Sequence, residues 1–318
     1  MATDLIELQT RRSIACFDVR LGLNATSWRV GEERREWIYT PDTWTTPTQG
    51  GIPILFPYPN RIAEGAFRWN SRDYFLGKND RGRHAIHGYV CDRQWQVSVV
   101  ARGSADSDLA WFCAAIEGPE DASLWPGAYR LSLVCRLCED KRTGPRLEYE
   151  FTVANRGDAP LPFGLGLHPY FSLPPEDVHL LVPVHRGQPP QIEVWELLDC
   201  IPTGRRLPLT GRHSQLFCDG SAAGQSYDDI YRLCHDTGWH LVVGDRVSRA
   251  GIVLRCSSSF RDLVVYTPAH RQAICFEPYT CVTNAIGMRD TVPDTGLQVI
   301  FPGEAWQGWI TFTARPAA

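Results

Sequence analysis

The sequence predicts an all-β protein, a large antiparallel β-sandwich. Short runs in which apolar and polar residues alternate recur along the chain, and clusters of Gly, Pro, Asn and Asp separate them. Glycine occurs 27 times and proline 23 times over the whole length, and convincing helical patterns are nearly absent. These observations favour short strands joined by turns and packed as two layers.

Four segments show the strand pattern clearly. In chain order they are residues 94–100 (QWQVSVV), 129–137 (YRLSLVCRL), 146–153 (RLEYEFTV) and 263–267 (LVVYT). Turn-forming residues precede the third run at 141–145 and follow it at 154–157, so we expect a hairpin there. No linker or break in composition divides the chain, and we expect a single domain over residues 1–318.

Length, composition and charge exclude several classes of protein. With 318 residues, 43% hydrophobic and 21% charged, the chain can bury a large core, which excludes a disordered or fibrous protein. The net charge of -4, from 32 Lys+Arg and 36 Asp+Glu, predicts no surface for nucleic acid. The N-terminus does not resemble a signal peptide and no apolar run reaches membrane-spanning length, so we expect a cytoplasmic protein that does not bind membranes.

The cysteines and histidines do not predict a metal site. Eleven cysteines without a secretion signal indicate reduced thiols and not a disulfide framework. Cys135 and Cys138 have the spacing of half a zinc site, but they lie in a strand pattern, where positions three apart face opposite ways. His84 and His87 lie in a segment that resembles a loop entering a strand, which is a poor chelating arrangement. We expect no metal and no cofactor.

Two segments place an ionisable residue directly before a proline. They are His168 in residues 164–171 (GLGLHPYF) and Glu277 in residues 276–280 (FEPYT). Because the residue before proline favours extended backbone, each side chain is expected to project from the end of a strand. A histidine and a glutamate held in this way suit general acid and base catalysis on one small molecule. Taken alone, these segments fit a buried structural histidine equally well.

Three other patterns give weaker evidence about function. Asp228 and Asp229 are adjacent, and in extended backbone only one of them can enter a given pocket; a solvated turn is an equal interpretation. Gly50 and Gly51 lack the Lys-Ser/Thr of a phosphate-binding loop, which argues against nucleotide binding. No Gly-x-Ser-x-Gly motif is present, so the sequence does not support a serine hydrolase.

Six motifs taken together are more specific. They are residues 50–61, 84–88 with 94–95, 166–171, 227–231, 276–280 with 284–285, and 295–304. In order and spacing the chain resembles the aldose 1-epimerases, the galactose mutarotase-like family, over nearly its whole length. The resemblance implies a single-domain β-supersandwich that binds one monosaccharide and uses no metal, nucleotide or covalent intermediate.

The resemblance also implies roles for five residues. These are a general base at Glu277, a general acid at His168, and groups that hold sugar hydroxyls at Arg61, His87 and Asp228. The base takes the proton of the C1 hydroxyl while the acid protonates the ring oxygen, and reclosure on the other face inverts the anomer. Asp228 is preferred to Asp229 from its place in the motif, but the sequence does not decide which of them faces the pocket.

The surroundings of the site carry further expectations. Glu277 should share its strand face with Ala273 and Cys275, so desolvation should raise its pKa. The motifs place four aromatic residues near the site, which suits the apolar face of a pyranose. They are Tyr58, Trp95, Tyr170 and Tyr279.

The sequence predicts the class of substrate but not the particular sugar. A free hexose is favoured over a hexose 6-phosphate because Cys91 stands where relatives often carry arginine, although Arg83 or Arg93 would supply positive charge. The stereochemistry of the sugar depends on loops such as residues 183–208, and the protein is expected to be a monomer or homodimer. Three further functions fit the sequence: a non-catalytic sugar-binding or sensing module, a hexose-6-phosphate 1-epimerase, and a lyase or hydrolase acting on an oligosaccharide.

Overall fold

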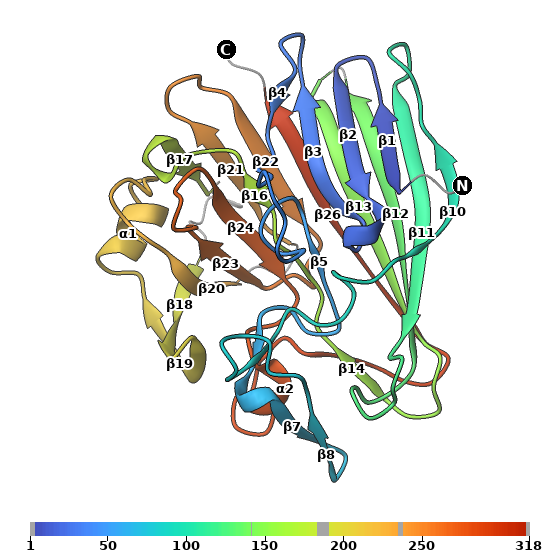
Figure 1. Ribbon diagram of the computed structural model, residues 1–318. Coiled ribbons are helices and arrows are strands. Elements are labelled where there is room, and N and C mark those ends of the chain that lie inside the picture. The colour runs from blue at the N-terminus through green and yellow to red at the C-terminus, as the bar shows by residue number, and fades with distance from the viewer. Residues whose placement is uncertain (1–3, 141, 183–190, 235–237, 316–318) are drawn as a thin grey trace.

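The computed structural model describes residues 4–140, 142–182, 191–234 and 238–315, and it confirms the predicted antiparallel β architecture (Figure 1). Two eight-stranded sheets and a four-stranded sheet dominate the chain. Most of the buried apolar side chains, among them Trp28, Phe151 and Phe312, form one continuous core. The alternation of apolar and polar residues therefore builds packed layers, as the sequence predicts.

The first large sheet holds the longest strands. In spatial order they are β10 (Gln96–Ala101), β11 (Leu109–Gly118), β12 (Tyr129–Asp140), β13 (Gly144–Asn155), β26 (Ala305–Arg315), β22 (Gly251–Cys256), β21 (His240–Asp245) and β17 (Val178–Leu181). β12 and β13 form the expected hairpin, in which Asp140 pairs with Gly144. Side chains along both strands alternate between buried and partly exposed, so one face of this sheet lies on the core.

The second large sheet carries the candidate site. Its order is β19 (Ile201–Pro208), β18 (Gln191–Leu198), β20 (Asp228–Cys234), β23 (Asp262–Tyr266), β24 (Ile274–Tyr279), β15 (Gly166–Leu167) and β5 (Ile54–Leu55), with β16 (Tyr170–Phe171) also paired to β24. Every residue of β24 is buried, which places this strand in the interior. The expectation of loops over 183–208 is wrong for 191–208, where β18 and β19 pair as a hairpin, and residues 183–190 lie outside the described residues.

Smaller elements complete the chain. The strands are β1 (Leu5–Gln9), β2 (Ser13–Asp18), β3 (Asn24–Val30), β4 (Arg35–Glu36), β6 (Arg61–Ile62), β7 (Ala66–Trp69), β8 (Arg72–Phe75), β9 (Ala85–Ile86), β14 (Leu161–Phe163) and β25 (Gln298–Ile300). The helices are α1 (Arg212–Phe217), α2 (Ala285–Met288) and three single 3₁₀ turns at Val19–Leu21, Ala63–Gly65 and Pro175–Asp177. None of the helices in the described ranges has the length and apolar character needed to cross a membrane.

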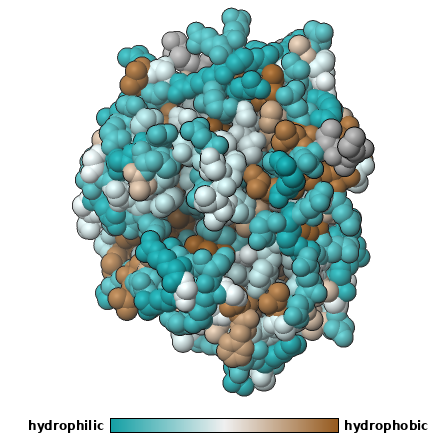
Figure 2. Space-filling model, viewed as in Figure 1, coloured by the Kyte–Doolittle hydropathy of each residue, from teal (hydrophilic) through white to brown (hydrophobic). Residues whose placement is uncertain are grey.

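On the face shown in Figure 2, hydrophobic residues occur in small patches among hydrophilic ones. Every cysteine with a described side chain is a free thiol. Cys135 is fully buried and Cys138 only partly, so the two side chains occupy opposite faces of β12, as their spacing predicts.

A buried ion pair holds β20 to β23. Arg232 and Asp262 are both 0% exposed, and the guanidinium donates to both carboxylate oxygens, at 3.0 and 2.9 Å. Trp195 Nε1 also donates to Asp262, at 2.9 Å, and Asp294 contacts Arg232 from the solvent side at 2.8 Å. A buried pair with its hydrogen bonds complete is costly to break from one side, since the remaining charge keeps its desolvation penalty.

We therefore expect Asp262→Ala to lower the free energy of unfolding by about 3–5 kcal/mol, because it leaves a buried guanidinium with only part of its compensation. Glu196→Ala, which breaks the solvent-exposed pair with Arg205, is the matched control and should cost no more than about 1 kcal/mol. Urea unfolding followed by tryptophan fluorescence measures both. Equal losses in the two variants would contradict a special contribution of the buried pair.

Candidate active site

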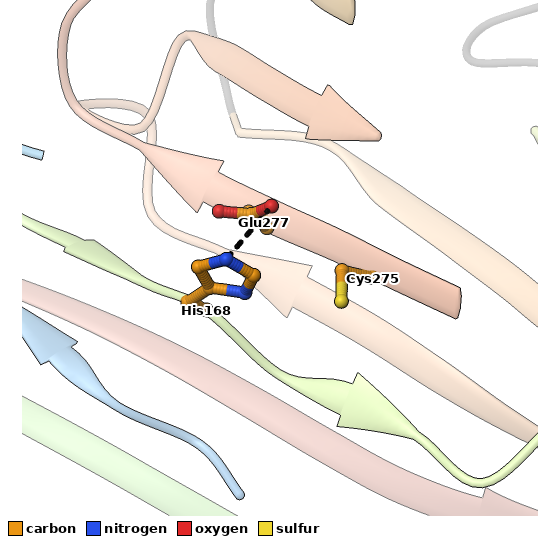
Figure 3. A group of neighbouring side chains, drawn as sticks. All are labelled: His168, Cys275 and Glu277. Carbon is orange, nitrogen blue, oxygen red and sulfur yellow. Dashed lines mark ion pairs between the residues drawn. The ribbon is translucent and has the colours of Figure 1, made fainter. Parts of the chain in front are cut away.

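His168 and Glu277 meet inside the protein (Figure 3). His168 lies between β15 and β16, Glu277 lies in β24, and His168 Nε2 is 3.5 Å from Glu277 Oε1. Their side chains are only 6% and 2% exposed. The prediction that both project from strand ends is confirmed for His168 but wrong for Glu277, because the fixed φ of Pro278 fits extended backbone and β24 continues to Tyr279.

Tyr279 supports Glu277 from the same face of β24. The two residues are two apart, so both side chains point the same way, and the Tyr279 hydroxyl donates a hydrogen bond to Glu277 Oε2. The ring of Tyr279 packs over Gly166 in β15, where a Cβ atom would lie 2.2 Å from the ring. Glycine at this position therefore makes room for the side chain that orients the glutamate.

Tyr170 supports His168 in a similar way. The two rings are stacked with centroids 4.5 Å apart, and the Tyr170 hydroxyl lies 3.4 Å from His168 Nε2. That hydroxyl also donates to the carbonyl of Thr48 at 2.7 Å, which holds the tyrosine in place. His168 Nδ1 is buried and has no hydrogen-bond partner among the described residues, so one ring nitrogen remains free to bind a ligand.

Burial drives the pKa values of the pair in opposite directions. Desolvation raises the pKa of Glu277 well above its usual range, despite the hydrogen bond from Tyr279. Desolvation, with a smaller contribution from the neighbouring His87, lowers the pKa of His168 well below its usual range. Burial therefore favours the uncharged form of both groups, a protonated carboxyl group and a neutral imidazole, and the raised pKa of Glu277 agrees with the expectation from the sequence.

Arg61 lies beside the pair at the start of β6. Its Nε donates to Asp80 Oδ2 at 2.6 Å, and its NH2 nitrogen lies 4.0 Å from Asp228 Oδ2. Asn284 fixes the backbone on either side, because its N–H donates to the Arg61 carbonyl and its side chain accepts a hydrogen bond from the Ala63 N–H. The guanidinium is thus held in one orientation while its side chain remains 13% exposed.

His87 lies against His168, with ring centroids 5.4 Å apart. Its backbone has a positive φ of 70°, a conformation that is strained for a residue with a side chain, and its N–H donates to the Asn60 carbonyl at 2.9 Å. Burial, with the nearby charge of Arg61, lowers the pKa of His87 to about 3. A neutral His87 whose buried Nδ1 has no partner among the described residues can accept or donate one hydrogen bond to a ligand.

The two adjacent aspartates face opposite ways. Asp228 is exposed on the side of Arg61, whereas Asp229 is buried and pairs with Arg212 at 2.7 Å. Across the sheet, Asp228 pairs with Tyr266, which in turn pairs with Cys275. The alternation of side chains along β20 therefore brings the first aspartate, and not the second, to the side of the acid and base.

The structure brings together all five residues singled out from the sequence, but only two of the four aromatic residues. Tyr170 and Tyr279 contact the pair, whereas Tyr58 stacks on Trp125 and the indole of Trp95 donates to the Val90 carbonyl. The expectations that Tyr58 and Trp95 lie at the site are therefore wrong. A residue can belong to a motif that reaches the site while its own side chain points elsewhere.

Sequence reasoning missed three neighbours of the site. Tyr266 faces the His168 ring with centroids 6.0 Å apart, Asp80 binds Arg61, and Cys200, at the turn between β18 and β19, lies 3.9 Å from Asp228. The strand pattern at 263–267 indicated where Tyr266 lies but not its face. No local signal distinguishes Asp80 or Cys200 from ordinary turn residues.

A groove of about 1020 Å³ lies elsewhere, on the outer face of the first large sheet. Arginines from β12, β13, β22 and β26 line it together with Trp309, and Arg136 and Arg146 in it pair with glutamates of β13. None of its described lining residues is a histidine. Its size alone therefore does not make it a site for proton transfer, and the buried pair is the better candidate.

A comparison with known protein families identifies the family of this chain. The model of the aldose 1-epimerase family, described as Aldose 1-epimerase, matches residues 4–313. The chain belongs to this family. This membership confirms the resemblance identified from the six motifs.

Individual relatives are distant. YihR of Escherichia coli, described as an uncharacterized protein, is 24% identical over 245 residues, which cover 73% of this chain and 70% of YihR. A galactose mutarotase-like protein from Clostridium acetobutylicum superposes with a TM-score of 0.83 at 19% identity, covering 98% of this chain and 95% of the other. A galactose 1-epimerase from Lactobacillus acidophilus superposes with a TM-score of 0.70 at 15% identity, covering 97% and 92%. At these identities the structural likeness shows the fold alone.

Burial of Glu277 predicts a pH-dependent cost in stability. The unfolded chain loses the Glu277 proton near pH 4.3, whereas the folded protein keeps it to higher pH, so the folded state binds more protons in between. The free energy of unfolding therefore falls as pH rises through this window, by up to about 1.4 kcal/mol per pH unit. Glu277→Gln removes this dependence, so its stability relative to the native protein should increase as the pH rises above the pKa of an unfolded glutamate toward the raised pKa of Glu277 in the folded protein.

Urea unfolding at several pH values measures this difference. Glu117→Gln, at a side chain 63% exposed, is the control and should show no growing gain. A gain for Glu277→Gln that does not change with pH would mean that the carboxyl group is not held neutral by burial.

Proposed function

We propose that the protein is an aldose 1-epimerase that interconverts the α and β anomers of a free, uncharged hexose. The observation that carries the proposal is the buried contact between His168 Nε2 and Glu277 Oε1, at 3.5 Å, with Arg61 and Asp228 beside it. Membership of the aldose 1-epimerase family supports the same reaction class. The proposal combines a proton donor and a proton acceptor with hydrogen-bonding groups for the sugar hydroxyls.

Glu277 and His168 share one transferable proton, and in the proposed reaction this proton must first lie on His168. Burial favours the uncharged arrangement, with the proton on Glu277. Transfer of this proton to His168 forms a carboxylate base and an imidazolium acid. The carboxylate then takes the C1 hydroxyl proton while the imidazolium protonates the ring oxygen, which opens the ring to the aldehyde. Rotation about the C1–C2 bond and the reverse transfers close the ring as the other anomer.

The charges around the site favour an uncharged sugar over a phosphorylated one. Arg61 lies beside the pair, and Asp80 and Asp228 together carry more negative charge than its guanidinium can balance. Arg83 pairs with Glu64 and Asp199, and Arg93 pairs with Glu120, so neither supplies a free positive charge. A phosphate would require a cationic partner to offset its desolvation, and we do not favour a hexose-6-phosphate 1-epimerase.

A sensing module and an oligosaccharide-cleaving enzyme would each treat the sugar differently from an epimerase. A sensing module would bind the sugar through Arg61, His87 and Asp228 but would leave its anomers to interconvert at the rate in water. A lyase or hydrolase would release new products from an oligosaccharide, and it would need a second carboxylate across the scissile bond. Polarimetry and product analysis separate these outcomes from anomer exchange.

Freshly dissolved α-D-glucose or α-D-galactose should lose its initial optical rotation faster with the protein than without it. Glu277→Gln and His168→Asn should each lower kcat by about 10²–10⁴-fold, since each removes one partner of the proton transfer. Polarimetry gives the rates and calorimetry gives the binding of sugar to the variants. Sugar binding without acceleration by the native protein would favour the sensing module.

The adjacent aspartates provide a matched pair of variants for the binding role. Asp228→Asn weakens a hydrogen bond from a charged group to the sugar, worth about 1.5–3 kcal/mol, and should raise KM by about 10- to 100-fold. Asp229→Asn breaks the pair with Arg212 on the opposite side and should change stability more than KM. Steady-state kinetics with thermal unfolding distinguishes them, and the reverse order of KM values would assign the role to Asp229.

A further inference from the structure

We propose that His168, Cys275 and Glu277 form a binding site for a single zinc ion, and that zinc and sugar exclude each other there. One ligand atom from each residue lies within 4.8 Å of those of the other two, and all three residues are buried (Figure 3). Binding of the ion does not depend on the proposed epimerase function. Only the competition with sugar rests on that proposal.

The backbone places the three ligands around one point. Cys275 and Glu277 are two residues apart in β24, so their side chains leave the same face of the strand. β16 pairs with β24 at Tyr170 and Cys275, which brings His168 over the same face. In Figure 3 the imidazole lies opposite the carboxylate and the thiol, with all three groups directed into the same space.

The distances require little movement to accept zinc. With Zn–N and Zn–O distances near 2.0–2.2 Å and Zn–S near 2.3 Å, ligand atoms in a tetrahedral site lie about 3.4–3.6 Å apart. His168 Nε2 and Glu277 Oε1 are already 3.5 Å apart. The sulfur lies within 4.8 Å of the other two ligand atoms, so by comparison with the tetrahedral spacing it must approach by no more than roughly 1 Å, a movement in the range that small changes of side-chain torsion supply. Three protein ligands leave the fourth position of the ion open.

The chemistry of the donors selects the metal. A nitrogen, a sulfur and an oxygen together suit zinc and other borderline-soft ions, whereas magnesium and calcium prefer oxygen ligands. The thiol has no other evident use in this site, since Cys275 is a free, buried cysteine. His168 Nδ1 is buried without a partner among the described residues, so no hydrogen bond on that side of the ring holds the imidazole against the small movement that zinc binding requires.

The charges of the complex suit a buried position. On binding, the Cys275 thiol and the Glu277 carboxyl group release their protons to solvent, and the thiolate, the carboxylate and Zn²⁺ sum to zero. A neutral complex avoids the cost of placing a net charge in the interior. Because His168 and Glu277 are also the proposed acid and base, a bound ion occupies both proton-transfer groups and prevents ring opening.

The test uses Zn²⁺ and Co²⁺ alone, added to the purified metal-free protein and to two alanine variants. Cys275→Ala removes the proposed ligand, whereas Cys281→Ala removes an equally buried thiol further along the same segment and is the matched control. The native protein and Cys281→Ala should bind one Zn²⁺, and their Co²⁺ forms should show a thiolate-to-cobalt charge-transfer band. Cys275→Ala should lose the band and bind Zn²⁺ at least about tenfold more weakly, the smallest loss that ligand-shell mutations typically cause.

A Co²⁺ band that persists in Cys275→Ala, or no Zn²⁺ binding by the native protein, would overturn the proposal. X-ray absorption of the zinc-loaded native protein provides a check that does not depend on the folding of a variant. It should show one sulfur among nitrogen and oxygen ligands, and a shell with no sulfur or with several sulfurs would also overturn it. Zinc bound in this way without inhibition of mutarotation would count against the proposed epimerase mechanism and not against the metal site.

Discussion

The chemical properties of the contact between Glu277 and His168 depend on their nearly complete burial away from water. β24 runs through the interior with every residue buried, so the carboxyl group on it has no solvent to stabilise its charge. The imidazole that meets it is also buried, and desolvation lowers its pKa well below the usual range, which favours its neutral form. Desolvation thus favours the proton on Glu277 and a neutral His168, so the proposed reaction begins with transfer of that proton to the imidazole.

The surrounding structure holds this pair in place without charging it. Tyr279 and Tyr170 contact the glutamate and the histidine through hydroxyl groups that stay protonated, because burial raises the pKa of both phenols well above the usual value. Charged residues lie one step further out, where Arg61 joins Asp80 and Asp228 close to the solvent. Neutral groups therefore orient the proton-transfer pair, while charged groups remain at positions where they can meet sugar hydroxyls.

The same face of β24 carries a thiol, and this gives the site a second chemical character. Cys275 lies between Tyr266 and Tyr170 in one row across the sheet, beside the glutamate and the histidine. The proposed acid and base, His168 and Glu277, are also two of the three proposed zinc ligands. The sulfur of Cys275 is the third. The buried Arg232–Asp262 pair, by contrast, belongs to the framework, since it joins the two strands that precede β24 in the sheet.

The sequence by itself determined the antiparallel β class, the β12–β13 hairpin and the position of His168 at a strand end, because alternation, turn residues and proline act over a few neighbouring residues. The resemblance of six motifs to a known family added which residues to expect together. Only the tertiary structure decided that Glu277 lies inside a strand, that Asp228 and not Asp229 approaches Arg61, and that Tyr58 and Trp95 point elsewhere. These outcomes depend on register and packing between segments far apart in the chain, which local residue patterns do not encode.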